Sequence, residues 1–163
     1  MKTFLTIDPG DNTGWSFWID RQTQKKPIQT GMYSIPKKIK KVEDQFVYMW
    51  NEFDNLINHF KPDKVYIEGV EVYPGSLKSK TASIKRSGQK IPSLFKLAFL
   101  IGGYCDVCAY NGIEFEIINF SQWGGQLSAN AVKVQVEHLL KQKYETQHIY
   151  DAVAMGLYIK KLL

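Results

Sequence analysis

The order of strand-like and helix-like patterns is the sequence feature that most constrains the fold of this chain. Runs of β-branched and aromatic residues predict strands over Thr3–Asp8, Trp15–Ile19 and Thr30–Ile35 before any helical pattern begins. Apolar residues then recur at helical spacing from Val42 to Phe60, and Pro62 closes this helix. Strands that follow one another through short turns favour antiparallel pairing.

The rest of the chain alternates strands with helices. Further strands are predicted over Lys64–Glu68 and Glu114–Asn119, and loops over Tyr73–Pro92 and Ser121–Ser128. The predicted helices cover Ser93–Asn111, Ala129–Lys143 and His148–Leu163. Together these patterns predict an α/β fold with a mixed five-stranded sheet, in which three antiparallel strands precede parallel strands and helices flank the sheet.

The length of 163 residues suits a single domain over residues 1–163, and no internal repeat or linker divides it. No continuous apolar run approaches the roughly 20 residues that span a bilayer. Asp8 comes too early in the chain for the apolar region of a signal peptide. We therefore expect a cytoplasmic protein without a membrane partner.

Cys105 and Cys108 have the C-x-x-C spacing of some zinc and redox sites. A structural zinc site needs about four ligands, and the sequence offers no second pair of cysteines. The surrounding segment, Phe99–Ala109, has the composition of a mostly buried helix. We expect the two cysteines to be small apolar residues of the core.

Basic residues are unevenly distributed in a chain whose net charge is +5. No acidic residue lies between Glu71 and Asp106, and this interval contains Lys78, Lys80, Lys85, Arg86, Lys90 and Lys96. A second basic run consists of Lys37, Lys38, Lys40 and Lys41. Clustered cations indicate a phosphate-rich partner, although charge alone is equally consistent with a solvated loop. The basic segment at about 73–92 is long for a loop, so we expect it to be mobile and functional.

Two carboxylates stand at the ends of predicted strands. Asp8 ends the first strand before a Pro-Gly turn, and Glu68 ends the fourth before Gly69. If these strands are parallel neighbours, their axes lie about 4.8 Å apart. Carboxylates that close together repel each other unless a cation lies between them. Taken singly, each could also be an ordinary turn or strand-end residue.

The last predicted helix brings further candidate ligands. His148 and Asp151 are three positions apart and therefore share one helix face. Small residues that would let this helix lie close to the sheet follow: Ala152, Ala154 and Gly156. Close packing would bring His148 and Asp151 to Asp8 and Glu68. Carboxylates with one imidazole suit Mg²⁺ or Mn²⁺.

Four short motifs together resemble the RuvC family of Holliday-junction resolvases. They are Ile7-Asp8-Pro9-Gly10 followed by Thr13-Gly14-Trp15, Ile67-Glu68-Gly69, Ala131-x-Lys133-x-Gln135-Val136, and His148-x-x-Asp151-Ala152-x-Ala154. The resemblance extends over nearly the whole chain. It implies a ribonuclease-H-like fold and a metal-dependent crossover-junction endodeoxyribonuclease that acts on four-way DNA junctions as a homodimer.

The resemblance also implies roles for individual residues. Asp8, Glu68 and Asp151 match the metal-binding acids of the family, and His148 matches a position where some members have histidine. These four residues would be both catalytic and metal-binding, with two Mg²⁺ ions, or Mn²⁺, hydrolysing the phosphodiester. Lys133 matches a catalytic lysine that holds the DNA phosphate. The loop after Glu68 would contact DNA through Tyr73, by stacking, and through Lys78, Lys80, Lys85, Arg86 and Lys90.

Two departures from the family pattern bear on the substrate. The loop after Glu68 is longer and more basic than usual, and Phe120–Gln126 contains no lysine or arginine. Both departures favour a phage-type resolvase with a broad preference for branched DNA. Two alternatives remain open: a ribonuclease-H-like nuclease that acts on RNA–DNA hybrids or RNA, and a DNA-binding module without catalysis.

Overall fold

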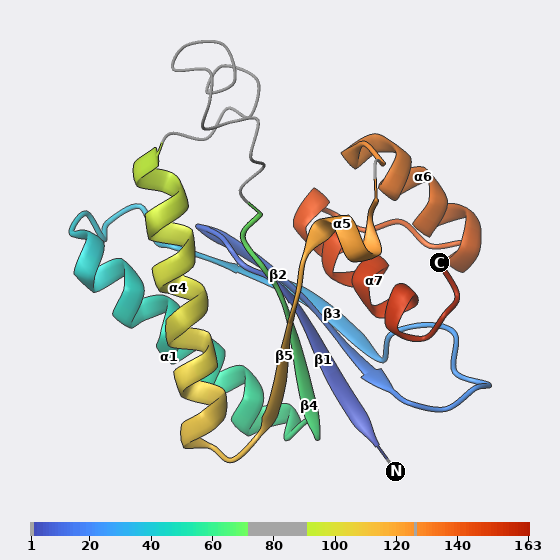
Figure 1. The fold of residues 1–163 in the computed structure, drawn as a ribbon, viewed down its shortest axis with the longest axis horizontal. Helices are drawn as coiled ribbons and strands as arrows, with labels where there is room; N and C mark the ends of the chain where they lie inside the picture. The colour runs from blue at the N-terminus through green and yellow to red at the C-terminus, as the bar shows by residue number, and fades with distance from the viewer. Residues whose placement is uncertain (1, 72–90, 126) are drawn as a thin grey trace.

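The computed structural model describes residues 2–71, 91–125 and 127–163, which form a mixed sheet with helices on both faces (Figure 1). The strands are β1 (Thr3–Asp8), β2 (Asn12–Ile19), β3 (Gln29–Ser34), β4 (Lys64–Glu68) and β5 (Glu114–Ile118). Their order across the sheet is β3-β2-β1-β4-β5. The β1–β2 and β2–β3 pairs are antiparallel, whereas β4 is parallel to both β1 and β5. The predicted sheet is therefore confirmed.

The helices divide between the two faces of the sheet, as Figure 1 shows. One face carries α1 (Val42–Phe60) and α4 (Ile91–Tyr110), which pack on each other. The other face carries α7 (Gln147–Ile159), which contacts β1 and β2 and is itself covered by α6 (Ala129–Leu140) and the short α5 (Phe120–Trp123). Each face has its own apolar cluster of buried residues.

The central strand β1 explains why the sheet needs helices on both sides. Leu5 and Ile7 are fully buried in the cluster beneath α1 and α4, whereas Phe4 belongs to the cluster beneath α7. Burying one such side chain contributes about 1.5–3 kcal/mol. A strand buried on both faces lacks a regular alternation of apolar and polar residues, and within Phe4–Ile7 only the hydroxyl of Thr6 interrupts the apolar side chains.

Several element boundaries differ from the sequence prediction. β2 begins at Asn12, because its pairing with β3 extends to the Asn12–Ser34 pair. Part of the loop expected over Ser121–Ser128 is the helix α5, which begins with a reciprocal capping box between Asn119 and Gln122. α6 ends at Leu140 and α7 at Ile159. The loop expected over residues 73–92 lies outside the described residues, except that α4 begins at Ile91.

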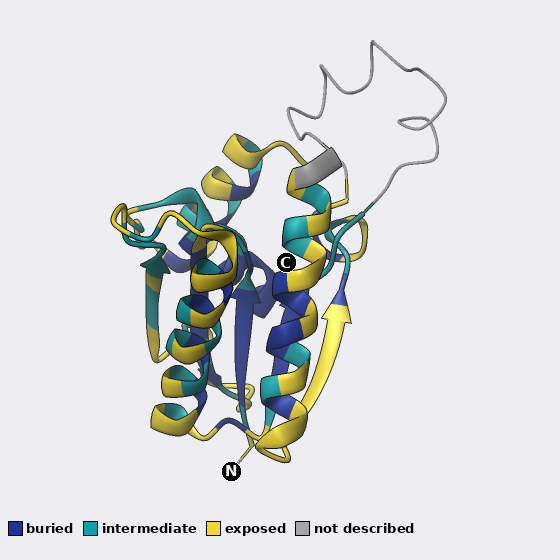
Figure 2. Cartoon of the chain, turned by 90° about the vertical axis from the view of Figure 1, so that its left-hand side faces the viewer, coloured by how far each residue is buried: buried dark blue, intermediate teal, exposed yellow. Residues whose placement is uncertain are grey.

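The expectation of a mostly buried helix over Phe99–Ala109 is wrong for one face of α4. Its segment Ser93–Tyr110 is long and apolar enough to cross a membrane by length and composition, yet only 22% of that segment is buried. Phe95 and Phe99 are 73% and 58% exposed. Figure 2 shows the exposed outer sides of α1 and α4 in front of the buried strands. The opposite face of α4 is a core face, which includes Leu100, Ile101, Tyr104 and Cys108.

Both cysteines pack in the core, as expected from the sequence. Cys108 is buried and Cys105 is half-buried, and both pack in the cluster beneath α1 and α4. Burial raises the pKa of the Cys108 thiol to about 12. A thiol that stays protonated is neither a good nucleophile nor a metal ligand, which agrees with a packing role.

Buried hydroxyl groups attach α7 to the centre of the sheet. The Thr6 and Ser16 hydroxyls both donate hydrogen bonds to the backbone carbonyl of Ala152, over 2.7 and 3.1 Å. The Trp18 indole N–H in turn donates to the Ser16 hydroxyl. A Cβ at Gly156 would overlap the Trp18 ring, so α7 can lie this close only with glycine there. This contact sets the height of α7 above β1 and β2.

We predict that Thr6→Val, which keeps the shape of the side chain, lowers the free energy of unfolding by about 1–3 kcal/mol. The valine would leave a buried carbonyl and a buried hydroxyl short of one partner. Chemical denaturation measures this loss. Thr30→Val on the edge strand β3 serves as the control, and an equal effect of both substitutions would show that the hydroxyl contact contributes nothing to stability.

Candidate active site

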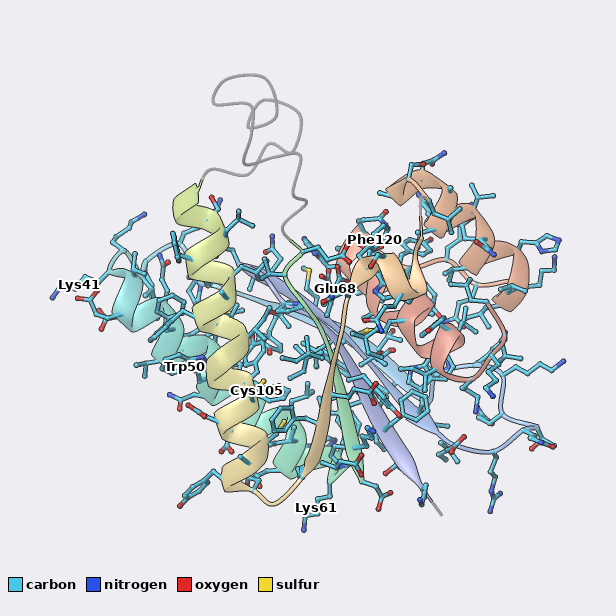
Figure 3. All side chains as sticks on the ribbon, in the orientation of Figure 1. Lys41, Trp50, Lys61, Glu68, Cys105 and Phe120 are labelled. Atoms are coloured by element: carbon cyan, nitrogen blue, oxygen red, sulfur yellow. The ribbon has the colours of Figure 1, made fainter. Side chains whose placement is uncertain are left out.

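The pairing of β1 with β4 brings two carboxylates to one edge of the sheet. Ile7 pairs with Ile67 in this parallel ladder, so Asp8 and Glu68 leave the sheet together at adjacent strand ends. Both line the same pocket. Figure 3 shows Glu68 at the end of β4, on the side where α5 begins with Phe120. A hydrogen bond from the Ser121 backbone N–H to the Glu71 carboxylate connects the start of α5 to the segment that follows β4.

A glycine lets the first turn of α7 reach the same edge. Gly14 is paired with Asp8 across the β1–β2 turn, and a Cβ at this position would overlap the backbone carbonyl of His148. The beginning of α7 therefore lies directly against the turn. His148 lines the pocket, and Asp151 lies one turn further along α7.

Asp8 and His148 are in direct contact within the pocket. The His148 Nδ1 lies 2.7 Å from the Asp8 Oδ2, with 14% of the Asp8 side chain and 40% of the His148 side chain exposed. The hydrogen bond to Asp8 raises the pKa of His148. Burial raises the pKa of Asp8 more than the imidazole lowers it. The imidazole therefore does not fully offset the burial of the Asp8 carboxylate.

The crowding of acids is also evident at Glu68 and Asp151. Burial, with the nearby Asp8 and Asp151 carboxylates, raises the pKa of Glu68 to about 9. Burial and Asp8 raise the pKa of Asp151 to about 6. Each carboxyl thus holds its proton more tightly because it is desolvated beside like charges. A divalent cation that binds there would displace protons and relieve this repulsion.

Gln147 is a residue of this site that the sequence reasoning missed. Its side-chain amide donates to the Asp151 carboxylate over 2.8 Å and to the backbone carbonyl of Ala129 over 3.2 Å. Gln147 therefore connects the orientation of Asp151 to the start of α6. The available signal was the four-residue spacing between Gln147 and Asp151, which places both on one face of a helix.

The wall opposite the acids is formed by one face of α4. The pocket has a volume of about 510 Å³, and Ser93, Lys96, Leu97 and Leu100 line it at helical spacing. Two leucines and a lysine therefore face three acids: Asp8, Asp11 and Glu68. The sequence reasoning placed Lys96 in the basic interval but did not assign it to the site.

Other predicted site residues lie elsewhere or outside the described part of the chain. Lys133 is exposed on α6, with its ammonium 5.5 Å from the centre of the Tyr150 ring, and it is not among the residues that line the pocket. Its catalytic role stays a prediction. The DNA contacts predicted in the loop lie outside the described residues: Tyr73, Lys78, Lys80, Lys85, Arg86 and Lys90.

The donor chemistry of the pocket fits a hard divalent cation. Desolvated carboxylates with raised pKa values are the oxygen ligands that Mg²⁺ and Mn²⁺ prefer, and His148 adds a nitrogen. Within residues 2–71, 91–125 and 127–163, however, no group of three or more potential ligands has metal-binding geometry. Asp8 instead contacts His148, and Asp151 contacts Gln147. These side chains would have to reorient to share one ion.

We predict that Gln147→Leu weakens Mn²⁺ binding about tenfold or more, because the loss of a hydrogen bond that orients a ligand typically lowers metal affinity 10–100-fold. Calorimetric titration of the protein with Mn²⁺ measures this effect. Gln142→Leu, in the exposed connection between α6 and α7, serves as the control. Equal Mn²⁺ affinity in both variants would remove Gln147 from the site.

Several solved structures are similar to this chain in fold. No family model matches it, and neither does any curated protein sequence. RuvC of Thermus thermophilus, solved with a Holliday junction substrate, is 15% identical, with 95% of this chain and 90% of that chain covered and a TM-score of 0.72.

Two further solved structures are resolvases from other sources. The yeast mitochondrial Holliday junction resolvase Ydc2 is 13% identical over 97% of this chain and 79% of its own, with a TM-score of 0.60. The fowlpox virus resolvase, solved with Holliday junction DNA, is 13% identical over 98% and 97% of the two chains, with a TM-score of 0.51. The chain therefore has the fold of RuvC and other Holliday-junction resolvases, as its motifs predicted.

Proposed function

We propose that this protein is a metal-dependent endonuclease that resolves Holliday junctions and other branched DNA by phosphodiester hydrolysis. The observation that carries the proposal is the convergence of Asp8 and Glu68 with the beginning of α7, where His148 lines the same pocket and Asp151, one turn later, lies near enough to raise the pKa of Glu68. The fold adds support, because two of the similar structures contain Holliday junction DNA.

The residues in and beside the pocket have separate tasks in this proposal. Asp8, Glu68, Asp151 and His148 would hold two Mg²⁺ or Mn²⁺ ions. Such ions, when bound, supply an activated water and stabilise the departing 3′ oxygen. Gln147 orients the Asp151 carboxylate, and His148 restrains Asp8. Leu97 and Leu100 form the apolar part of the pocket wall on the side of α4. The contacts predicted for Lys133 and for the basic segment would hold the DNA backbone.

The energetics of the acids weigh against a DNA-binding module without catalysis. Glu68 is held in a desolvated position where its pKa is raised to about 9. Burying acids beside one another destabilises the free protein, because each carboxyl must either stay charged without its hydration or hold a proton at neutral pH. A pure binding surface gains nothing from this arrangement, whereas a metal-dependent nuclease needs it.

We predict that the wild-type protein with Mg²⁺ cuts a synthetic four-way junction in preference to linear duplex, and that Asp8→Asn abolishes cutting but keeps DNA binding. Asparagine preserves the shape of the side chain and removes the charge that would bind the ion. Product mapping on gels, with flap and RNA–DNA hybrid substrates in parallel, measures the preference.

Asp63→Asn is the matched control, because Asp63 receives hydrogen bonds from Thr3 at the far end of β1. Cleavage by the Asp8 variant would exclude Asp8 from the site. Preferred cutting of the hybrid would instead favour an RNA-directed nuclease.

The protein also has a surface suited to a second copy of itself, and we propose that it acts as a homodimer. A groove of about 610 Å³ lies between α1 and α4. It is lined by the exposed side chains of Val42, Phe95 and Phe99, by the buried Phe46, and by Ser93 and Lys96. The last two residues also line the catalytic pocket. Paired cuts in a junction of roughly two-fold symmetry require two sites, which a C2 dimer provides.

We predict that Phe99→Glu converts a dimer into a monomer and replaces paired incisions by single nicks, because a carboxylate cannot be buried in an apolar interface. Sedimentation velocity and product analysis measure the two effects. Leu139→Glu, a comparably exposed residue of α6 on the other face of the sheet, should leave the dimer intact. A wild-type protein that is monomeric both alone and on a junction would refute the homodimer.

A further inference from the structure

We infer that Lys96 is a phosphate-binding residue of the catalytic pocket, which positions the backbone of the DNA strand to be cut. This inference rests on the proposed nuclease function and assigns one contact of its substrate. No sequence motif identified Lys96, and its assignment comes from the wall that α4 contributes to the pocket.

The charge distribution of the pocket calls for such a cation. Among the described residues that line it, Lys96 is the only lysine or arginine, and it faces Asp8, Asp11 and Glu68. A DNA strand that approaches these carboxylates brings further negative charge. A positioned ammonium beside the acids offsets repulsion of the incoming phosphates. Lys133, the lysine expected in this role, does not line the pocket.

The ammonium of Lys96 is held in place before DNA arrives. Its Nζ lies 2.6 Å from the Asp11 Oδ1 and 2.9 Å from the Gln45 Oε1, with 28% of the side chain exposed. The Gln45 amide is itself fixed, because its N–H group donates to the Ile39 carbonyl over 3.0 Å. A lysine carries three N–H donors, so Asp11 and Gln45 leave capacity for a phosphate oxygen.

The Asp11 carboxylate contacts the same Lys96 ammonium that a DNA phosphate would contact. Its carboxylate is 66% exposed on the turn between β1 and β2, and it meets the ammonium at the edge of the pocket. A DNA phosphate would share the ammonium with this carboxylate or displace it into solvent. The simpler alternative is that the Asp11–Lys96 ion pair only ties the β1–β2 turn to α4. The two alternatives predict different effects of removing Asp11.

Lys64 provides a matched control within the same chain. Its ammonium also has two partners, Glu114 at 2.7 Å and Glu116 at 3.0 Å, and 24% of its side chain is exposed. These carboxylates raise the pKa of Lys64. Lys64 begins β4, whereas Glu68 ends that strand at the pocket. Lys64 thus resembles Lys96 in burial and pairing but not in position.

The test measures junction binding in EDTA, so that no divalent ion or cleavage takes part, across a series of salt concentrations. Fluorescence anisotropy compares the wild type with Lys96→Met, Lys96→Arg, Asp11→Asn and Lys64→Met. We expect Lys96→Met to weaken binding on the order of tenfold. The slope of log K against log[salt] should become shallower by about 0.9, the value for one lost phosphate contact.

The other variants separate phosphate binding from a structural tie. Lys96→Arg should keep the wild-type salt dependence, Asp11→Asn should bind as tightly as the wild type or more tightly, and Lys64→Met should match the wild type. Equal losses in Lys96→Met and Asp11→Asn, or an unchanged salt slope in Lys96→Met, would overturn the inference. A wild type that binds and cuts junctions while Lys96→Met behaves identically refutes only this inference. A wild type that does neither refutes the nuclease function as well.

Discussion

The burial of several carboxylates at one edge of the sheet is the constraint on which the rest of the structure depends. Glu68, Asp8 and Asp151 are desolvated beside one another, and burial is the largest cause of the raised pKa at each. Like charges do not gather unless packing elsewhere enforces it. The β1–β4 ladder fixes two of the acids, and the hydroxyl contacts of Thr6 and Ser16 with α7 fix the third.

The sequence predicted this convergence because each part of it has a local signature. Strand ends are marked by Pro-Gly and Glu-Gly turns, and the small residues that follow Asp151 indicate a closely packed helix. Gln147 and Lys96 have no such signature, since their roles depend on which segments become neighbours after folding. The same reason explains the exposed aromatic face of α4. Composition alone makes an apolar helix look buried, and only the packing of α1 against one side of it shows which face stays open.

The residues that line the pocket come from both sides of the sheet. The acids and His148 come from strand ends and from α7, on the side packed by α6, whereas the opposite wall comes from α4. The side chains proposed as ligands for a cation thus sit on the centre of the fold, where the β1 ladder and α7 hold them. The wall that would contact the DNA backbone belongs to a different layer, with Lys96 anchored through Gln45 to α1.

In this arrangement α4 carries both a lysine of the pocket wall and an aromatic residue of the proposed dimer surface. Lys96 and Phe99 are separated by less than one turn of the same helix, so a shift of α4 along its axis displaces both side chains together. A second copy of the protein that binds at Phe99 would therefore also influence the position of the Lys96 ammonium. By thermodynamic reciprocity, DNA whose phosphate is bound by Lys96 would change the affinity of the two protein copies for each other by the same factor. Dimerisation and DNA binding would then both depend on the position of α4.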